Sequence, residues 1–256
     1  MLDQPPLRVG VVIPARDEAA TVGRVVQGMR GLGRWDERVH VSVVIVCDNG
    51  SQDDTAGIAA RAGALVVTEP EPGYGRACLA AIARLPAVDA VLFVDADGQF
   101  EPADARHLLG AVMDGADLVI GSRPAGRPDK HALSLPQRFG NWLATRMIRL
   151  FWNAEYSDLG PYRAIRADAL ARLDMRSRTF GWTVEMQVKA IQAGLVVAER
   201  AVSTRRRIGR SRISGTLRGV IMAGVGIIGT IVLLRVRERR FRKALFRQER
   251  RGRIAM

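Results

Sequence analysis

One short stretch decides the fold class, because residues 91–99 read VLFVDADGQ. The apolar run Val91–Val94 predicts a strand that is buried on both faces, as in a parallel sheet. Asp95 and Asp97 follow directly after it, so their carboxylates can reach one divalent cation. Hard oxygen ligands of this kind favour Mg²⁺ or Mn²⁺, and Gln99 can add a neutral oxygen. We therefore expect a metal site formed by Asp95, Asp97 and Gln99.

Outward from this stretch, apolar runs alternate with helical patterns. Strands are expected at 8–13, 39–47, 64–68, 90–94 and 118–121, with helices at 17–29, 53–62, 74–85 and 103–113. This alternation predicts βαβ units, and therefore an α/β fold with a largely parallel sheet flanked by helices. The polar clusters at 14–18, 48–54 and 95–99 each follow a strand. Ligands bind at the carboxyl ends of such strands, so we expect the three clusters to meet at one edge.

The pattern changes in the second half of the chain. A loop is expected at 124–136, helices at 136–152 and 183–192, and a short strand at 195–198. The 16 residues 219–234 carry no charge, which is short of the roughly 20 that a membrane-spanning helix needs. We favour an interfacial or re-entrant helix here, while a short anchored span and a buried soluble helix are the alternatives. The predicted organisation is a catalytic domain at 1–205 and a basic segment at 206–256, with an apolar helix at 217–235.

The net charge of +13 is concentrated at the C-terminal end. Residues 200–256 hold 17 Arg and Lys against two acids, a net of +15, so residues 1–199 carry −2. Such a tail suits anionic lipid, nucleic acid or phosphorylated substrates. Aromatic residues make up only 5%, which disfavours stacking on single-stranded nucleic acid. Because an apolar run is nearby, we expect a membrane surface and no nucleic acid.

Two further features bear on location and redox state. The first six residues lack the basic start and apolar core of a signal peptide, so we expect the domain on the cytoplasmic side, peripheral to the membrane or shallowly inserted. Cys47 and Cys78 fit no metal-ligand spacing and are interpreted as core residues.

Three motifs in order resemble glycosyltransferase family 2. They read VVIPARDE at 11–18, DNGSQDDT at 48–55 and FVDADGQ at 93–99, and GSR follows at 121–123. Over roughly residues 8–216 the chain looks most like the dolichol-phosphate mannose synthases and polyprenyl-phosphate glucosyltransferases of that family. The resemblance implies a GT-A-type (Rossmann-like) fold and a metal-dependent hexosyltransferase with a nucleotide-sugar donor.

The resemblance also implies roles for single residues. The nucleotide pocket would be lined by Pro14, Ala15, Arg16, Glu18, Asp95 and Ala96. Asp48 would contact the nucleobase in that pocket. Asp48 on its own is equally consistent with an Asx-turn or a helix cap. Phosphate groups would be met by Arg123 and Arg138, and the acceptor phosphate also by Arg206 or Arg207 and by Ser211. The segment 160–163 reads GPYR where mannose synthases commonly have SGFR, which leaves the sugar and the acceptor open.

The residues also fit the chemistry without the resemblance. A metal and arginines neutralise the charge that grows on a leaving nucleoside diphosphate. A phosphate acceptor is already ionised and needs no general base, which suits a chain with three His. A hydroxyl acceptor would need a base, and Asp158 and Glu185 are then the candidates, although each also fits a cap or a paired helix residue.

The favoured hypothesis is an inverting transferase that moves a hexose from a UDP-glucose- or GDP-mannose-type donor to a polyprenyl phosphate at the membrane. One alternative is the same fold with a hydroxyl acceptor, such as a lipid, glycan or small metabolite. A sugar-phosphate nucleotidyltransferase is disfavoured, because its Gly-rich loop is absent after the first strand. A non-catalytic membrane- or nucleic-acid-binding protein is disfavoured by the presence of Asp48, Asp95 and Asp97.

Overall fold

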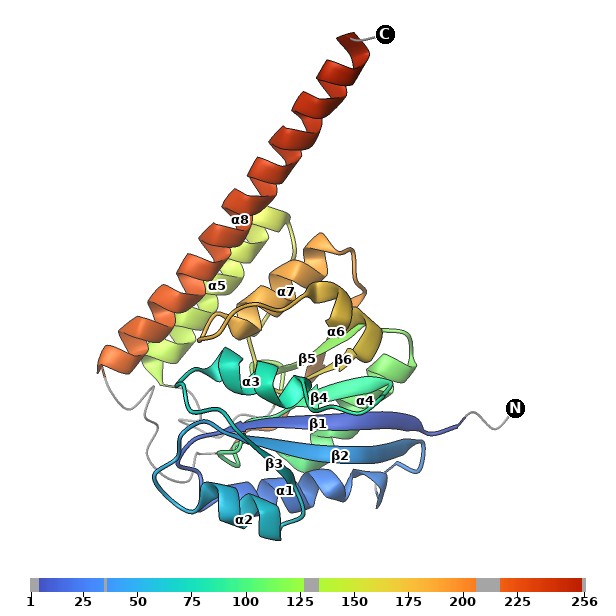
Figure 1. The fold of residues 1–256 in the computed structure, drawn as a ribbon, viewed down its shortest axis with the longest axis vertical. Helices are drawn as coiled ribbons and strands as arrows, with labels where there is room; N and C mark the ends of the chain where they lie inside the picture. Colours follow the sequence, from blue (N-terminus) through green and yellow to red (C-terminus); the bar gives the residue numbers. More distant parts are fainter. Residues whose placement is uncertain (1–4, 35, 127–133, 206–216, 255–256) are drawn as a thin grey trace.

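The computed structural model describes residues 5–34, 36–126, 134–205 and 217–254. Seven strands form one sheet in the order β3-β2-β1-β4-β6-β5-β7 (Figure 1). The strands are β1 (Leu7–Ala15), β2 (Val39–Asp48), β3 (Leu65–Thr68), β4 (Ala90–Phe93), β5 (Leu118–Ser122), β6 (Arg163–Arg166) and β7 (Val197–Ala201). The α-helices are α1 (Val22–Arg30), α2 (Thr55–Arg61), α3 (Tyr74–Ile82), α4 (Ala105–Met113), α5 (Leu135–Trp152), α6 (Ala167–Leu173), α7 (Trp182–Gln192) and α8 (Leu217–Ile254).

The sheet is largely parallel, as predicted, with one antiparallel strand. β1 pairs in parallel with β2 and β4, β2 with β3, and β5 with β7, whereas β6 runs antiparallel between β4 and β5. β6 was not predicted from the sequence. It has only four residues and an arginine at each end, so it lacks the continuous apolar run of its neighbours. Arg163 is nevertheless fully buried, because its guanidinium donates to backbone carbonyls.

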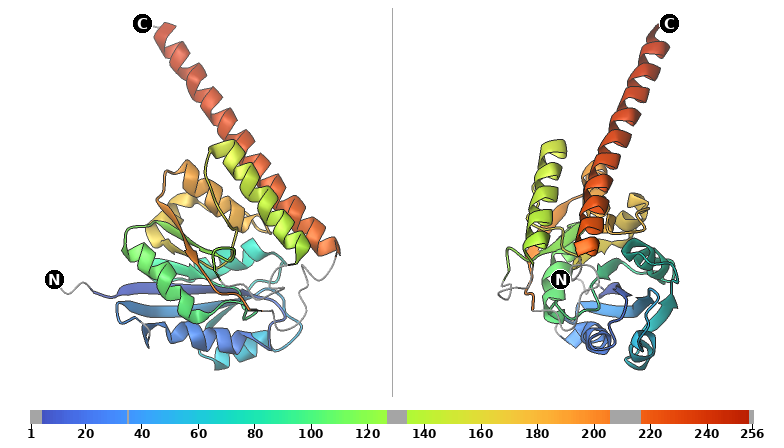
Figure 2. Two further views of the ribbon diagram at one scale, coloured as in Figure 1. Left: turned by 180° about the vertical axis from the view of Figure 1, so that it is seen from behind. Right: turned by 90° about the vertical axis from the view of Figure 1, so that its left-hand side faces the viewer.

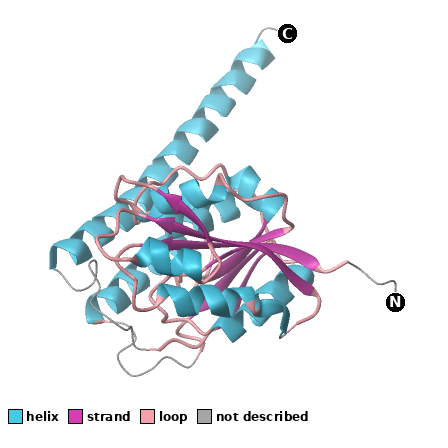
Figure 3. Cartoon of the chain, turned by 60° about the horizontal axis from the view of Figure 1, so that its bottom comes forward, coloured by secondary structure: helices cyan, strands magenta, loops and turns pink. Residues whose placement is uncertain are grey.

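Helices cover both faces of the sheet (Figures 1 and 3). Side chains of α1, α2 and α4 share one apolar core with β1 and β4. Those of α3, α6 and α7 form a second core on the opposite face. Cys47 and Cys78 are free and buried in this second core, as predicted.

The first helix begins later than predicted. The sequence pattern placed its start near Asp17, but α1 begins at Val22. Asp17 has a φ of 55°, in the left-handed region that a non-glycine residue adopts only when its surroundings hold it there. Residues 17–21, which were expected to be helical, are therefore an ordered loop.

The last helix packs on the domain and also extends past it. α8 starts where the apolar helix was expected and continues to Ile254, well beyond residue 235. Ile231 and Leu234 are buried against residues of α5 and α7, among them Ala144 and Val188. α5 and α8 lie side by side in both views of Figure 2, and the C-terminal end of α8 projects from the domain.

One face of α8 is therefore buried against the domain, as the buried-helix alternative expected, but the whole helix is not buried. Elsewhere on the helix, Met222 is 58% and Val225 is 65% exposed. Within the described ranges, no helix combines the length and apolar character needed to cross a membrane.

The docking of α8 can be tested by truncating its buried face. Ile231→Ala should lower the free energy of unfolding by about 2–5 kcal/mol, the usual cost of removing a buried isoleucine side chain. The neighbouring Val232→Ala is the control, because Val232 is 45% exposed and should change stability little. Urea denaturation measures both, and equal effects of the two substitutions would show that α8 does not pack as described.

Candidate active site

The three predicted polar clusters meet at one edge of the sheet. β1 lies between β2 and β4, and all three strands run in the same direction, so their carboxyl ends are adjacent. Ala15 is the register partner of Asp48, and Val12 is the partner of Phe93. The expectation that 14–18, 48–54 and 95–99 share one edge is therefore confirmed.

The loop after β1 is hydrogen-bonded to the loop after β2. The Asp17 amide donates to Ser51 Oγ at 3.0 Å, and the Gln52 amide donates to Asp17 Oδ1 at 2.7 Å. The Glu18 amide donates to Thr55 Oγ1 at 2.8 Å. These bonds explain the left-handed conformation of Asp17 and fix Arg16 and Glu18, which the sequence assigns to the nucleotide pocket.

Asp48 lies at the floor of this region with 8% of its surface exposed. Its Oδ1 accepts the Ser51 amide at 3.3 Å, which is the turn contact that the sequence left open beside a nucleobase role. The next residue, Asn49, was not predicted to matter. Its side-chain amide donates to the carbonyls of Glu69 (2.9 Å) and Glu71 (2.7 Å), and its Oδ1 accepts the Gly73 amide at 2.7 Å. Asn49 therefore fastens the segment before α3 to the end of β2.

The candidate metal loop holds its carboxylates through specific donors. Tyr74 Oη donates to Asp95 Oδ1 at 3.0 Å. Burial, and then the charge of Asp95, raise the pKa of Tyr74 well above its ordinary value, so its hydroxyl is a donor at neutral pH. Asp97 is 5% exposed, and its Oδ1 accepts the Gln99 amide at 3.1 Å.

The metal loop also meets the start of the basic stretch. Gln99 Nε2 donates to the Arg205 carbonyl at 3.3 Å, and the Arg205 amide donates to the Gln99 carbonyl at 2.8 Å. Arg205 forms an ion pair with Glu101. Arg206, Arg207 and Ser211 lie outside the described residues, but the chain leading to them starts beside Gln99.

Arg123 and Asp158 form a buried ion pair. Arg123 Nε donates to Asp158 Oδ2 and Nη2 donates to Oδ1, both at 2.7 Å, while the Arg123 amide donates to Oδ2 at 2.9 Å. The side chain of Asp158 is fully buried and that of Arg123 is 17% exposed. Burial opposes the charge of Arg123, but the hydrogen bonds and charge of Asp158 outweigh it and raise the pKa of Arg123.

The loop that carries Asp158 is held from several sides. Asn141 of α5 donates to the Ser157 carbonyl at 3.0 Å and accepts the Leu159 amide at 2.8 Å. Gln187 of α7 donates to the Asp158 carbonyl at 3.0 Å. The fully buried Arg163 donates to the Gly160 carbonyl at 3.1 Å. Burial lowers the pKa of Arg163 to about 10, which leaves it charged at neutral pH.

Glu185 is the second carboxylate that the sequence offered as a base, and it too is engaged. It is 4% exposed. Its oxygens accept the amides of Arg176 (3.1 Å) and Ser177 (2.7 Å), and Lys189 Nζ lies 2.8 Å from Oε1. Glu185 therefore fixes the backbone before α7.

Arg138 lies one helical turn before Asn141 on α5, and it is exposed. Ser134 caps this helix: its Oγ accepts the Gln137 amide, and Gln137 Oε1 accepts the Ser134 amide. Because Asn141 contacts the Asp158 loop, the start of α5 is attached to the part of the sheet edge that Arg123 and Asp158 occupy.

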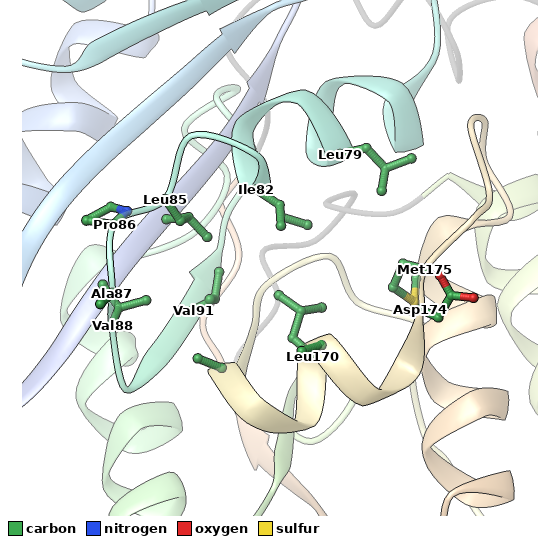
Figure 4. A pocket seen from close by; sticks show the side chains of 12 residues that line it. Leu79, Ile82, Leu85, Pro86, Ala87, Val88, Val91, Leu170, Asp174 and Met175 are labelled. Carbon is green, nitrogen blue, oxygen red and sulfur yellow. The ribbon is translucent and has the colours of Figure 1, made fainter.

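A separate cavity of about 380 Å³ lies between α3 and α6 (Figure 4). Its lining is mainly apolar and includes Leu79, Ile82, Val91, Leu170 and Met175, with Asp174 as its charged side chain. A nucleoside diphosphate needs donors for its phosphates, so this cavity does not suit a nucleotide sugar.

A family model described as glycosyl transferase family 2 matches residues 10–173, which is more than half of the chain. The chain belongs to glycosyl transferase family 2. This confirms the family resemblance and the enzyme class, and it sets aside the nucleotidyltransferase and the non-catalytic alternatives.

Curated proteins of similar sequence include two from mycobacteria. An uncharacterized glycosyltransferase of Mycobacterium tuberculosis is 40% identical over 182 residues, covering 70% of this chain and 81% of the relative. The polyprenol monophosphomannose synthase of Mycolicibacterium smegmatis is 27% identical, covering 83% of each chain.

A crystal structure of glucosyl-3-phosphoglycerate synthase from Mycobacterium tuberculosis with Mn²⁺, uridine-diphosphate and phosphoglyceric acid matches with a TM-score of 0.73. It is 21% identical and covers 90% of this chain and 78% of that chain. This likeness confirms the GT-A-type fold.

The donor set of this glycosyltransferase fits a divalent cation that a substrate helps to bind. Asp95 and Asp97 offer hard carboxylate oxygens on one loop. Among the described residues, no group of three or more His, Cys, Asp or Glu side chains is placed to hold a metal by itself. Ions such as Mg²⁺ are commonly bound by one or two carboxylates together with substrate phosphates, and this loop has that composition.

The contribution of the Arg123–Asp158 ion pair to stability can be tested by substitution. Asp158→Asn should lower the free energy of unfolding by about 3–5 kcal/mol, because it leaves the Arg123 guanidinium without its counter-charge in a desolvated position. Asp168→Asn is the control, since Asp168 pairs with Arg166 at the surface, where solvent screens the charges. Urea denaturation should separate the two variants clearly, and an Asp158→Asn cost no larger than that of the control would contradict a bracing role.

Proposed function

We propose that this glycosyltransferase moves a hexose, with inversion, from a UDP-glucose- or GDP-mannose-type donor to a polyprenyl phosphate at the cytoplasmic face of a membrane. The observation that carries the proposal is the engagement of both candidate bases. Asp158 is gripped by Arg123, and Glu185 accepts two backbone amides and pairs with Lys189. A general base must lie within hydrogen-bond reach of the proton that it removes, whereas the oxygens of these two carboxylates are directed at partners within the protein. A phosphate acceptor is already ionised at neutral pH, so its transfer reaction does not need a general base.

The donor half of the proposal uses the edge formed by β1, β2 and β4. Pro14, Ala15, Arg16 and Glu18 would line the nucleotide pocket with Ala96, and Asp48 would receive the base. Asp95, Asp97 and Gln99 would hold Mg²⁺ or Mn²⁺ with the donor diphosphate. When bound, such an ion neutralises charge on the leaving group.

Arg123 has a different part in the proposal from the one the sequence implied. Its guanidinium fork faces Asp158, whose charge offsets its own, so Arg123 would brace the site and would not grip a donor phosphate with two parallel hydrogen bonds. Its buried pair also keeps the end of β5 attached to the loop before β6.

The acceptor half uses α5 and the basic stretch after Arg205. The start of α5 exposes Leu135 (78%), Phe139 (62%) and Trp142 (55%), and the exposed Arg138 lies among them. Apolar side chains interleaved with arginine are typical of a helix that lies on an anionic bilayer surface. Arg138, Arg206, Arg207 and Ser211 would bind the lipid phosphate there. The relative named as a polyprenol monophosphomannose synthase also supports a polyprenyl phosphate acceptor.

Replacing Arg138 tests the acceptor assignment. Arg138→Ala should raise the KM for polyprenyl phosphate about tenfold to a hundredfold, the usual value of hydrogen bonds to a charged group, and leave nucleotide binding unchanged. Arg138→Lys should recover only part of the loss, because an ammonium keeps the charge but not the fork.

Arg146→Ala is the matched control, because Arg146 is an exposed arginine two turns further along α5. Transfer assays over a range of acceptor concentrations, with the donor saturating, measure the three variants. An unchanged acceptor KM in Arg138→Ala, or an equal effect of Arg146→Ala, would contradict the assignment.

A further inference from the structure

The residues 73–75, Gly-Tyr-Gly, have no role in the function described so far. They form the entry to α3, and Tyr74 reaches from there to Asp95, with its hydroxyl 3.0 Å from Oδ1. A tyrosine hydroxyl is a neutral donor. It can fix the orientation of a carboxylate without cancelling the negative charge that a cation requires.

The entry to α3 is held in place from two directions. On one side, Asn49 Oδ1 accepts the Gly73 amide at 2.7 Å. On the other side, the Arg76 amide donates to the Arg178 carbonyl at 3.1 Å. The backbone approach is so close that a Cβ at Gly73 or Gly75 would collide with the carbonyl oxygens of Arg178 or Ser177.

The segment 174–178, here called the strap, is held in turn by Glu185. Its carboxylate accepts the amides of Arg176 and Ser177, and Lys189 pairs with the same carboxylate. Contacts therefore run without a break from Glu185 through the strap to the entry of α3, and from Tyr74 to Asp95.

We propose that Tyr74 is a positioning residue for the metal site, which orients Asp95 toward the cation, and that Glu185 acts through the strap to hold Tyr74 in place. The inference rests on the proposed function, because it assigns Asp95 to a cation shared with the donor diphosphate. Two carboxylates on one loop bind weakly unless they are held in the right direction. Residues that hydrogen-bond to metal ligands typically change metal affinity by 10–100-fold.

The test measures Mn²⁺ binding in the presence of UDP or GDP. The concentration of free Mn²⁺ is monitored by electron paramagnetic resonance. Tyr74→Phe should weaken Mn²⁺ binding about tenfold or more and leave the urea midpoint nearly unchanged, since only one hydroxyl is removed. Tyr156→Phe is the matched control, because Tyr156 is a partly buried tyrosine that packs against the same core from the loop before β6. It should bind Mn²⁺ as the wild type does.

A second comparison tests the strap. Glu185→Gln should also weaken Mn²⁺ binding, because an amide cannot accept from both backbone donors and pair with Lys189. If Glu185 acts through Tyr74, the double variant should bind Mn²⁺ no more weakly than Tyr74→Phe alone. Additive losses would overturn the strap connection.

The outcomes separate this inference from the proposed function. Wild-type protein that bound no Mn²⁺ with either nucleotide would overturn the metal-site assignment and the inference together. Wild-type binding that Tyr74→Phe left unchanged would overturn the role of Tyr74 alone.

Discussion

The ion pair between Arg123 and Asp158 is the constraint on which the candidate site depends. Arg123 follows β5 directly, and Asp158 lies on the loop before β6, so the pair joins two segments that are 35 residues apart in sequence. Taking both charges out of water is costly, and only a well-matched geometry compensates for it. The structure provides that geometry through three bonds to one carboxylate and through Asn141, Gln187 and Arg163, which hold the loop. The end of β5 and the loop before β6 are therefore held together by contacts within the protein itself.

These contacts affect which residues can act as a general base. The two carboxylates best placed by sequence to act as bases support the structure, Asp158 by holding Arg123 and Glu185 by holding the strap. A site built in this way suits an acceptor that brings its own negative charge. In the proposed reaction, cations would have two tasks, which are to steady the leaving diphosphate and to receive the incoming phosphate. Arg205 is hydrogen-bonded to Gln99, so the basic stretch proposed for the second task begins beside the metal loop.

The sequence predicted the sheet well where burial leaves a simple pattern. β4, residues 9–13 of β1 and residues 44–47 of β2 are buried on both faces, so each is an apolar run that leads to a polar cluster. β6 was missed because its buried Arg163 looks like a surface residue in the sequence. Backbone carbonyls that accept from its guanidinium make its burial possible, and the sequence near Arg163 does not indicate them. The start of α1 was misplaced because the conformation of Asp17 depends on Ser51 and Gln52 in another loop. The roles of Asn49 and Tyr74 were not predicted, because their hydrogen-bond partners also lie in other loops. A tyrosine between two glycines at the start of a helix is nevertheless a signal in the sequence. Asp158 and Glu185 were identified from the sequence as candidate bases, but only the structure shows what each one holds.

A direct comparison of two acceptors that differ in one group tests the central claim. Purified protein would be given UDP-glucose or GDP-mannose with a labelled sugar, Mn²⁺, and either a polyprenyl phosphate or the polyprenol of the same chain length. If the acceptor supplies its own charge, labelled lipid should form only with the phosphate, and mild acid should release the sugar from it. Transfer to the polyprenol, with the phosphate inert, would contradict the account and require a base that the described site does not offer.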